Sequence, residues 1–316
     1  MPTVLRKYGT LIGILAVIAF FWINLPDTFM TGRNWLNISQ QMSMLAVIAF
    51  AMTAVMAMGD FDLSVGSMAS LAGIVAALVF IATGSVALGV VAALGAGVLG
   101  GLLNGILVSY FGILPFVATL GTMTVFSGLA SWLAGGKTIF GSAIPESFSG
   151  FARGGITLGS LAIPSLTLVA LGVFAVIWLL LEQTVHGRKL YAIGGNAEAA
   201  RLAGVRVKQL RFAAFGLTGL GSAVGGLMYA SRVASANPAQ GSGLMLDAIA
   251  AVFLGMTMSE EGEPRVAYTL AGVLVLGVLG NGLTQLNVDS YVREMMIGTI
   301  IVIAVAASSI SKLRIH

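Results

Sequence analysis

Three carboxylates in apolar surroundings are the residues of this sequence best placed to do chemistry. The segment Gly59-Asp60-Phe61-Asp62-Leu63-Ser64 joins two apolar stretches with almost no loop, and Asp247 lies inside another apolar stretch. Carboxylates near membrane depth are costly to bury and usually serve a function. One role is a polar lining or gate for a hydroxyl-rich solute. The other is structural: Asp62 or Ser64 caps the helix that follows, and the same two roles are open for Asp247.

Two asparagines, Asn104 and Asn281, also lie within apolar stretches. We expect these side chains first to form hydrogen bonds between helices, and the alternative is that they line a polar path for a solute. Arg293 and Glu294 are neighbours near the end of a stretch, where such charges pair locally and reach toward the interface. The candidates for a solute path through the chain are Asp60, Phe61, Asp62, Ser64, Asn104, Phe116, Asp247 and Asn281.

No pattern in the sequence indicates an enzyme. The segment 131–138 is similar to a phosphate-binding loop, but Ser131 stands where that loop requires its first glycine. The sequence has no nucleophile elbow, no paired-histidine zinc motif and no dinucleotide fingerprint. With two histidines and no cysteine, we expect neither a metal site nor a cofactor in this chain. If ATP drives its activity, ATP and magnesium bind a separate chain.

The composition indicates a polytopic membrane protein. The mean hydropathy is +0.99, and only 9% of the residues are charged, against about 25% in soluble domains. The 42 glycines suit helices that pack closely in lipid. The basic pI of about 9.6 arises from the connections between apolar stretches, so we do not expect nucleic-acid binding.

Stretches of about 20 apolar residues can cross a bilayer as helices, and about ten such stretches follow one another along the chain. We therefore expect an all-α fold with a single transmembrane domain, 1–316. The first stretch resembles a signal peptide, but no small-residue cleavage site follows it, so we expect a retained span. The expected spans are 8–25, 38–58, 65–82, 86–110, 114–134, 163–181, 212–230, 243–257, 266–286 and 291–308.

Basic residues orient the chain, because short cytoplasmic loops keep Lys and Arg. With both termini in the cytoplasm, eleven of the sixteen basic residues fall on the cytoplasmic side and five outside. The longest outer connection is 135–162. The largest cytoplasmic one is 182–211, a charged island that holds Arg188, Lys189, Arg201, Arg206, Lys208 and Arg211.

The island contains a short helix with its own start and stop signals. Asn196 suits the N-cap, Glu198 suits the first turn, and Gly204 suits the left-handed position after the last turn. One interpretation is a basic loop that lies at the membrane surface, and the other is a knob that docks on a cytoplasmic partner. We use "the knob" for residues 196–204.

An internal repeat is also visible. Asn104-Gly105 and Gly121-Thr122 recur as Asn281-Gly282 and Gly298-Thr299, at a constant offset of 177 residues. The repeat pairs spans 2–5 with spans 7–10, in halves of about 38–134 and 212–308. Because five spans separate equivalent helices, the halves have opposite orientations, as in the inverted repeats of many transporters.

Several motifs carry a resemblance to a known family. They are 59–67, 101–105, 115–122, Gly187-Arg188 and, most specific, 192–205, which reads Ala-Ile-Gly-Gly-Asn-Ala-Glu-Ala-Ala-Arg-Leu-Ala-Gly-Val. The chain resembles, over most of 42–305, the permease subunits of bacterial ABC importers for monosaccharides. This class includes ribose, arabinose, xylose, galactose and autoinducer-2 permeases, and the arabinose branch looks closest.

The resemblance implies a type II, vitamin-B12-importer-like fold in the bacterial inner membrane. It implies a second permease, two ATP-binding domains on a separate chain and a periplasmic sugar-binding protein as partners. It also makes the knob the coupling helix that docks on the ATPase, through Asn196, Ala197, Glu198, Ala199, Ala200, Arg201, Leu202, Ala203 and Gly204. One departure is the acidic connection 256–265, where the family has a glycine-rich turn; it leaves open whether the second permease is a copy of this chain or a related one.

Two functions remain open at this point. The first is a channel half that moves a small sugar into the cytoplasm by alternating access, driven by partner ATPases. The alternative is an ion-coupled secondary transporter that uses Asp60, Asp62 or Asp247 as proton or cation sites. An integral-membrane enzyme is disfavoured because no paired acid–base or metal groups stand out. The particular sugar cannot be read from the sequence.

Overall fold

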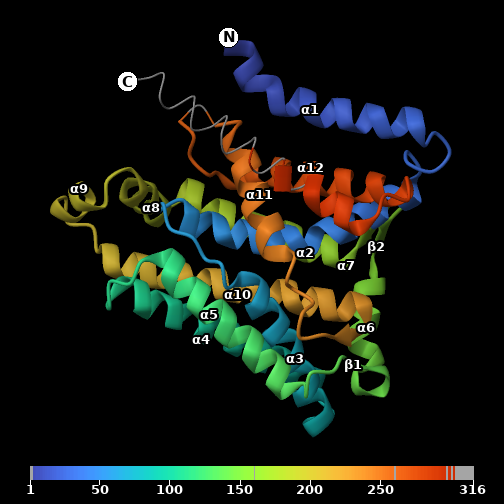
Figure 1. Ribbon diagram of the computed structural model, residues 1–316, viewed down its shortest axis with the longest axis horizontal. Helices are drawn as coiled ribbons and strands as arrows, with labels where there is room; N and C mark the ends of the chain where they lie inside the picture. The colour runs from blue at the N-terminus through green and yellow to red at the C-terminus, as the bar shows by residue number, and fades with distance from the viewer. Residues whose placement is uncertain (1–2, 160, 260, 297, 300–301, 303–316) are drawn as a thin grey trace.

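The computed structural model describes residues 3–159, 161–259, 261–296, 298, 299 and 302. Over these residues the chain folds mainly into helices, with two short pairs of antiparallel strands (Figure 1). A 3-10 turn, η1 (Gly141–Ala143), precedes α6, and a π-helical turn, η2 (Leu179–Gln183), extends α7. The helices are α1 (Thr3–Asn24), α2 (Gly32–Met56), α3 (Val65–Thr83), α4 (Val86–Ser109), α5 (Pro115–Leu133), α6 (Glu146–Arg153), α7 (Ser165–Trp178), α8 (Val185–Gly195), α9 (Ala197–Leu202), α10 (Val207–Val233), α11 (Leu244–Met256) and α12 (Val266–Gln285). The strands are β1 (Ile139–Phe140), β2 (Gly155–Leu158), β3 (Leu161–Pro164) and β4 (Ser235–Ala236).

Seven of the described helices are long and apolar enough to cross a membrane. They are α2, α3, α4, α5, α7 with η2, α10 and α12, while α1 and α11 contribute shorter apolar helices. Each of the nine expected spans from 8–25 to 266–286 coincides with one of these helices. The tenth, 291–308, falls largely outside the described residues. The chain is therefore a polytopic membrane protein, and the expected count of about ten spans is not confirmed.

The strands correct the all-helical expectation. Segment 135–162, expected as a loop, contains β1, η1, α6 and β2. β1 pairs with β4, about a hundred residues further along the chain, with Ile139 opposite Ala236, and β2 forms a hairpin with β3. Strands of two to four residues are too short to show an alternating pattern, so they could not be recognised from the sequence.

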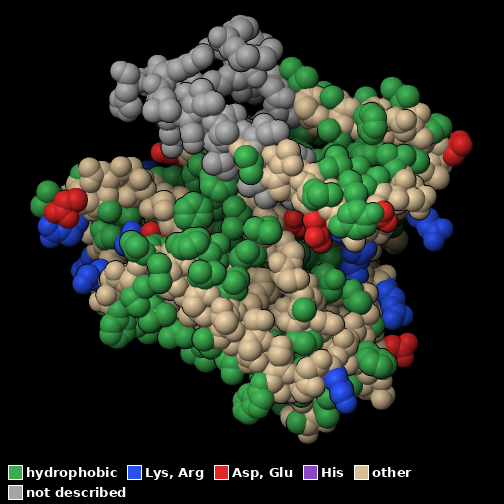
Figure 2. Space-filling view, in the orientation of Figure 1, with side chains coloured by type: hydrophobic (Ala, Val, Ile, Leu, Met, Phe, Trp, Pro, Cys, Tyr) green, Lys and Arg blue, Asp and Glu red, His purple; other side chains and the backbone are tan. Residues whose placement is uncertain are grey.

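The connections between helices gather at opposite ends of the bundle (Figure 1). At the knob end, α8 and α9 lie near the 259–265 connection, where Tyr191 Oη donates to Pro264 O at 3.0 Å. At the strand end, Ser231 Oγ donates to Phe148 O at 2.6 Å. In both cases, segments that we predicted to lie on the same side of the membrane are found at the same end of the bundle. Figure 2 shows most basic side chains toward these two ends, with a broad, largely hydrophobic zone between them.

α2 is the central helix of the bundle. From Met42 to its end every side chain is buried, and the helix contacts α7, α10, α11 and α12. Its hydroxyl groups are satisfied locally: Thr53 Oγ1 donates to Ala49 O at 2.8 Å and lies 3.0 Å from Thr269 Oγ1 of α12. This matters because hydrocarbon offers no alternative hydrogen-bond partner.

The most extensive contact between described helices is the seam between α4 and α10. Gly97, Gly101 and Gly105 recur every fourth residue and lie on one face of α4. A Cβ on Gly97 would come within 2.6 Å of Gly219 O, and one on Gly101 would collide with Phe215 O. Small residues at this spacing let the two backbones touch, which is how helices gain packing energy in lipid.

The inverted repeat stays a prediction. If spans 2–5 are paired with spans 7–10, α4 corresponds to α12 and α2 corresponds to α10. α4 packs on α10 and α12 packs on α2, as such a repeat predicts. The repeated glycines, however, have different neighbours: Gly105 faces Phe212 of α10, whereas Gly282 faces Phe21 of α1.

Two glycines of α4 test the seam. We expect Gly101→Ala to destabilise the protein by about 1–3 kcal/mol, because the added methyl group collides with the backbone of α10. Gly95→Ala is the matched control, since a Cβ there meets nothing within 4 Å. Thermal melting of both variants in detergent measures the difference. Equal melting temperatures would contradict the seam.

Candidate functional site

The segment between α2 and α3 is an interrupted helix inside the bundle. α2 ends at Met56 and α3 begins at Val65, and Gly59 adopts a positive φ of 79° between them. Asp60 and Asp62 follow, and their residues are only 5% and 1% exposed. Such a break is tolerated in a membrane protein only where other protein groups satisfy its backbone and side chains.

A buried polar cluster surrounds Asp62. Asp62 Oδ1 accepts from Ser64 N at 2.9 Å and from Ser64 Oγ at 2.6 Å. Asn104 Nδ2 of α4 donates to Ser64 Oγ at 2.8 Å, and Thr122 Oγ1 of α5 donates to Asn104 Oδ1 at 2.6 Å. The cluster pins α4 and α5 to the start of α3. Asn104 thus adopts the first role expected for it, a hydrogen bond between helices.

The capping role expected in this segment is met by Asp62 and not by Ser64. Ser64 occupies the N-cap of α3, but its side chain makes no capping hydrogen bond. Asp62 instead accepts from the Ser64 amide two residues later, which is a turn common to Asp and Asn. Its carboxylate is held by neutral donors from Ser64 and, at 3.4 Å, Asn104.

Asp60 has a different partner, which the sequence analysis did not identify. Its Oδ2 atom lies 2.6 Å from Arg211 Nε, in the first turns of α10, with the two side chains 7% and 24% exposed. Because the two groups carry opposite charges, they form a close ion pair. Pairing with the Arg211 cation offsets the cost of burying this carboxylate. This ion pair ties the break to the helix that directly follows the knob.

The remaining path candidates are dispersed. Phe61 packs against Phe253 of α11, with ring centroids 6.0 Å apart. Phe116 is 57% exposed on α5. Asp247 lies in the first turn of α11, within electrostatic range of Arg293 and Glu294. Asn281 accepts from Gln285 Nε2 of its own helix at 2.8 Å, so it does not repeat the contacts of Asn104.

The local structure predicted for the knob is confirmed. Asn196 Oδ1 accepts from Ala199 N at 2.9 Å at the start of α9, and Gly204 has a φ of 84° after its end. Arg201 donates two hydrogen bonds to the Glu198 carboxylate, from Nη2 to Oε1 at 2.6 Å and from Nε to Oε2 at 2.9 Å. These hydrogen bonds lower the pKa of Glu198. The prediction missed α8, which precedes the knob.

The knob presents most of its residues to solvent. Ala200 is buried against the protein and Ala197 is partly buried, while the other seven residues are exposed. Leu202, which follows Arg201, is 74% exposed. An isolated exposed apolar side chain is ordinary on its own, so its meaning depends on what the chain belongs to.

The fold and the knob together define a polytopic membrane protein with a structured end outside the hydrophobic zone. A family model described as "Branched-chain amino acid transport system / permease component" matches residues 34–305, so the chain belongs to this family. It is a permease component and not an enzyme.

Curated relatives cover nearly the whole chain. The ribose import permease protein RbsC of Bacillus subtilis (strain 168) is 38% identical over 302 residues, covering 96% of this chain and 92% of the relative. RbsC of Escherichia coli (strain K12) is 36% identical over 301 residues, covering 95% and 93%. The galactose/methyl galactoside import permease protein MglC of Escherichia coli (strain K12) is 33% identical over 327 residues, covering 99% and 96%. The resemblance to sugar permeases is confirmed.

The two repeat-related asparagines provide a test of the cluster. We expect Asn104→Leu to lower the stability by about 1–3 kcal/mol, because it leaves buried groups of Ser64 and Thr122 without their partner. Asn281→Leu should cost less, since among the described residues its side chain is bonded to Gln285, one turn away on the same helix. Melting in detergent compares them. A larger loss for Asn281→Leu would show that the cluster is not what holds the break.

Proposed function

We propose that this chain is the membrane permease subunit of an ATP-driven importer, which moves a monosaccharide of the pentose or hexose class into the cytoplasm by alternating access. The observation that carries the proposal is its similarity, over at least 95% of its length, to proteins named as ribose and galactose import permeases. The fold agrees with this function, since its apolar helices surround an interrupted, polar segment. Broken helices commonly mark substrate sites in transporters.

The proposed energy source is a separate ATP-binding cassette subunit, and ATP and magnesium bind there with no cofactor in this chain. The knob is its proposed docking point. Glu198 and Arg201 stiffen the knob, and Leu202 offers an apolar side chain at its end. A rigid helix bearing an exposed apolar anchor is well suited to a cleft on a partner, because little conformational freedom is lost on docking.

The proposed setting is the bacterial inner membrane, with both termini and the knob in the cytoplasm. The strand end then faces the periplasm, where a sugar-binding protein delivers the solute. A second permease, either a copy or a related chain, completes the channel. The proposed path passes Asp60, Phe61, Asp62, Ser64, Asn104, Phe116, Asp247 and Asn281. Within it, Asp62, Ser64 and Asn104 hold the break in place, and Phe61 with Phe253 narrows the passage.

The alternative function, ion-coupled secondary transport, has less support. It needs carboxylates that are free to bind a proton or cation. Asp60 is already paired with Arg211, and the relatives that match along the whole chain carry the names of import permeases. Ion-gradient-driven uptake by vesicles that contain this chain and no ATPase would favour the alternative.

Single cysteines test the orientation, because the chain has none of its own. We expect Leu202→Cys at the knob to react with a membrane-impermeant maleimide only after cells are opened. Phe140→Cys, which replaces a 70% exposed side chain at the strand end, should react in cells whose outer membrane is permeabilised. The opposite labelling pattern would reverse the proposed topology.

A charge at the knob tests docking. Leu202→Asp should reduce co-purification of the ATP-binding subunit about tenfold or more, since the carboxylate cannot enter an apolar cleft without losing its hydration. Phe140→Asp is the matched control at the strand end and should leave association unchanged. Undiminished association of Leu202→Asp, with normal expression in the membrane, would rule out the knob as the anchor.

A further inference from the structure

The knob is attached to the bundle through a stiff connection. η2 ends at Gln183, and α8 begins two residues later with Thr184 as its N-cap. A Cβ on Gly187 would collide with the Leu181 carbonyl, so α8 leaves the end of α7 in a tight turn. Thr184 secures this turn, because its hydroxyl donates to Leu180 O at 2.6 Å and accepts from Gly187 N at 3.3 Å.

One side of α8 is joined to the first half of the bundle. A Cβ on Gly194 would collide with the Ala57 carbonyl at the end of α2, so the two backbones are in direct contact. After the knob, Arg211 of α10 reaches Asp60 in the break between α2 and α3. The helices before and after the knob therefore both touch the same interrupted segment.

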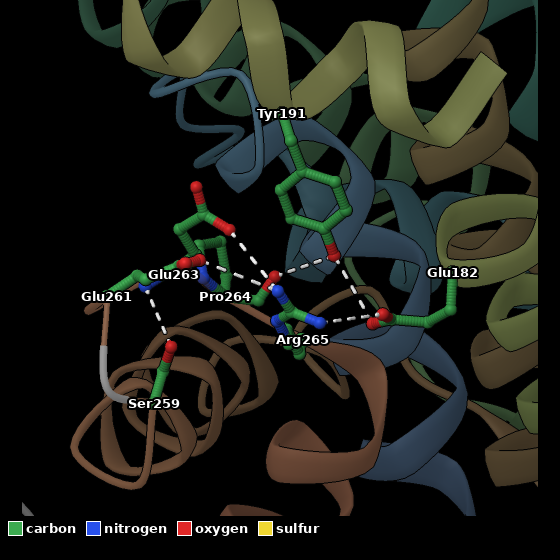
Figure 3. A network of polar contacts seen from close by, with 7 residues as sticks. All are labelled: Glu182, Tyr191, Ser259, Glu261, Glu263, Pro264 and Arg265. Carbon is green, nitrogen blue, oxygen red and sulfur yellow. Dashed lines mark hydrogen bonds and ion pairs between the residues drawn. The ribbon is translucent and has the colours of Figure 1, made fainter. Parts of the chain in front are cut away.

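The other side of α8 is joined to the second half, through the polar network drawn in Figure 3. Arg265, the N-cap residue of α12, lies at its centre, with Nη1 at 3.4 Å from Glu182 Oε2 and Cζ at 5.9 Å from the centre of the Tyr191 ring. Tyr191 Oη donates to Pro264 O at 3.0 Å. Glu261 and Glu263 lie 3.5 and 3.8 Å from the same guanidinium.

These contacts form a brace that we define as Glu182, Tyr191, Pro264 and Arg265. Glu182 belongs to η2, the turn that extends α7, and Tyr191 belongs to α8. Two elements that precede the knob therefore hold the connection between α11 and α12. The Glu182 side chain is 13% exposed and that of Arg265 is 41% exposed, so their ion pair is partly shielded from solvent. Burial, and then the charge of Glu182, raises the pKa of Tyr191 well above its usual range, so its hydroxyl remains a donor.

Within the described part of this junction, Arg265 is the basic residue that pairs with the three carboxylates of Glu182, Glu261 and Glu263. Without it, Glu182, Glu261 and Glu263 would repel one another, and the 259–265 connection would move away from α8. Its loss would leave the contacts of α8 with α2 in place, since they involve other residues. Arg265 therefore controls the attachment of the knob to the connection between α11 and α12.

We propose that this brace transmits movement of the knob to α11 and α12, and that Arg265 is a positioning residue that couples ATP hydrolysis to solute movement. The inference rests on the proposed function and gives the acidic connection 259–265 a role. With the brace intact, displacement of the knob moves both halves together. With the brace broken, the partner can still dock and hydrolyse ATP, but α11 and α12 no longer follow the knob.

The test uses the complete complex of this chain with its ATP-binding subunit and sugar-binding protein, reconstituted in vesicles. Labelled ribose and galactose serve as probes, and uptake and ATP hydrolysis are measured in the same sample. We expect Arg265→Gln to keep subunit association and basal hydrolysis within about twofold of wild type and to lower sugar uptake per ATP about fivefold or more, the usual scale of coupling between sites. Arg265→Lys should recover part of the uptake, because the ammonium retains the charge.

Two further variants complete the experiment. Tyr191→Phe removes the hydrogen bonds of the hydroxyl group to Pro264 O at 3.0 Å and to Glu182 Oε1 at 3.4 Å, and it should lower uptake per ATP about twofold. It decides the question if Arg265→Gln does not assemble. Arg153→Gln, at the strand end, is the control and should match wild type. If Arg265→Gln assembles and its uptake per ATP is unchanged, the role of the brace is overturned and the proposed function is not. If Arg265→Gln does not assemble, unchanged uptake per ATP in Tyr191→Phe has the same meaning. If the wild-type complex shows no ATP-dependent uptake, the proposed function is overturned, and the role of the brace is overturned with it.

Discussion

The lack of hydrogen-bond partners in hydrocarbon is the constraint on which this structure depends. The segment between α2 and α3 breaks a helix inside the bundle, so its polar groups have to be satisfied by the protein. Ser64, Asn104 and Thr122 do this in a chain of hydrogen bonds that begins at Asp62. The same contacts fix the relative positions of α3, α4 and α5. The break is thus both the least regular part of the bundle and one of its best-connected parts.

Close backbone packing provides the second part of this architecture. In lipid, helices gain little from the hydrophobic effect and associate through van der Waals contact between small residues. The glycine seam between α4 and α10 brings α10 against the first half of the bundle, and this places Arg211 within reach of Asp60. A packing feature therefore positions a charge, and the charge in turn neutralises a carboxylate that would be costly alone.

Membership of the permease family gives these features a functional context. A chain that imports sugar through the work of a partner needs a contact point outside the membrane and a mechanical link to its helices. In the proposed function the knob is the contact point, and it emerges from the bundle beside two attachments. One runs to the break through Ala57 and Asp60, and the other runs to α12 through Arg265. In this interpretation, polar side chains near the knob end of the bundle connect the docked ATP-binding subunit to the path of the solute.

The sequence alone was sufficient for much of the fold. Hydropathy located nine of the described helices, because apolar residues gather wherever a segment enters the bundle, and a full span needs about 20 of them. Asn196 and Gly204 marked the ends of the knob, because capping depends on adjacent residues only. The motif at 192–205 also indicated the family. The short strands and α8 were missed: β1 exists through its partner about a hundred residues away, and α8 lies in a charged region without an apolar period.

Pairings between distant residues were decided by the tertiary structure. The sequence identified Asp60, Asp62 and Asn104 as polar groups in apolar surroundings, but it could not assign Arg211 to Asp60 or Asn104 to Ser64. It also grouped Asp247 and Asn281 with them, although their contacts lie elsewhere. Composition and local order determine which segments enter the membrane, because the cost of exposing a residue to lipid depends on that residue. Which polar groups meet depends on how the helices pack, and that is a property of the folded bundle alone.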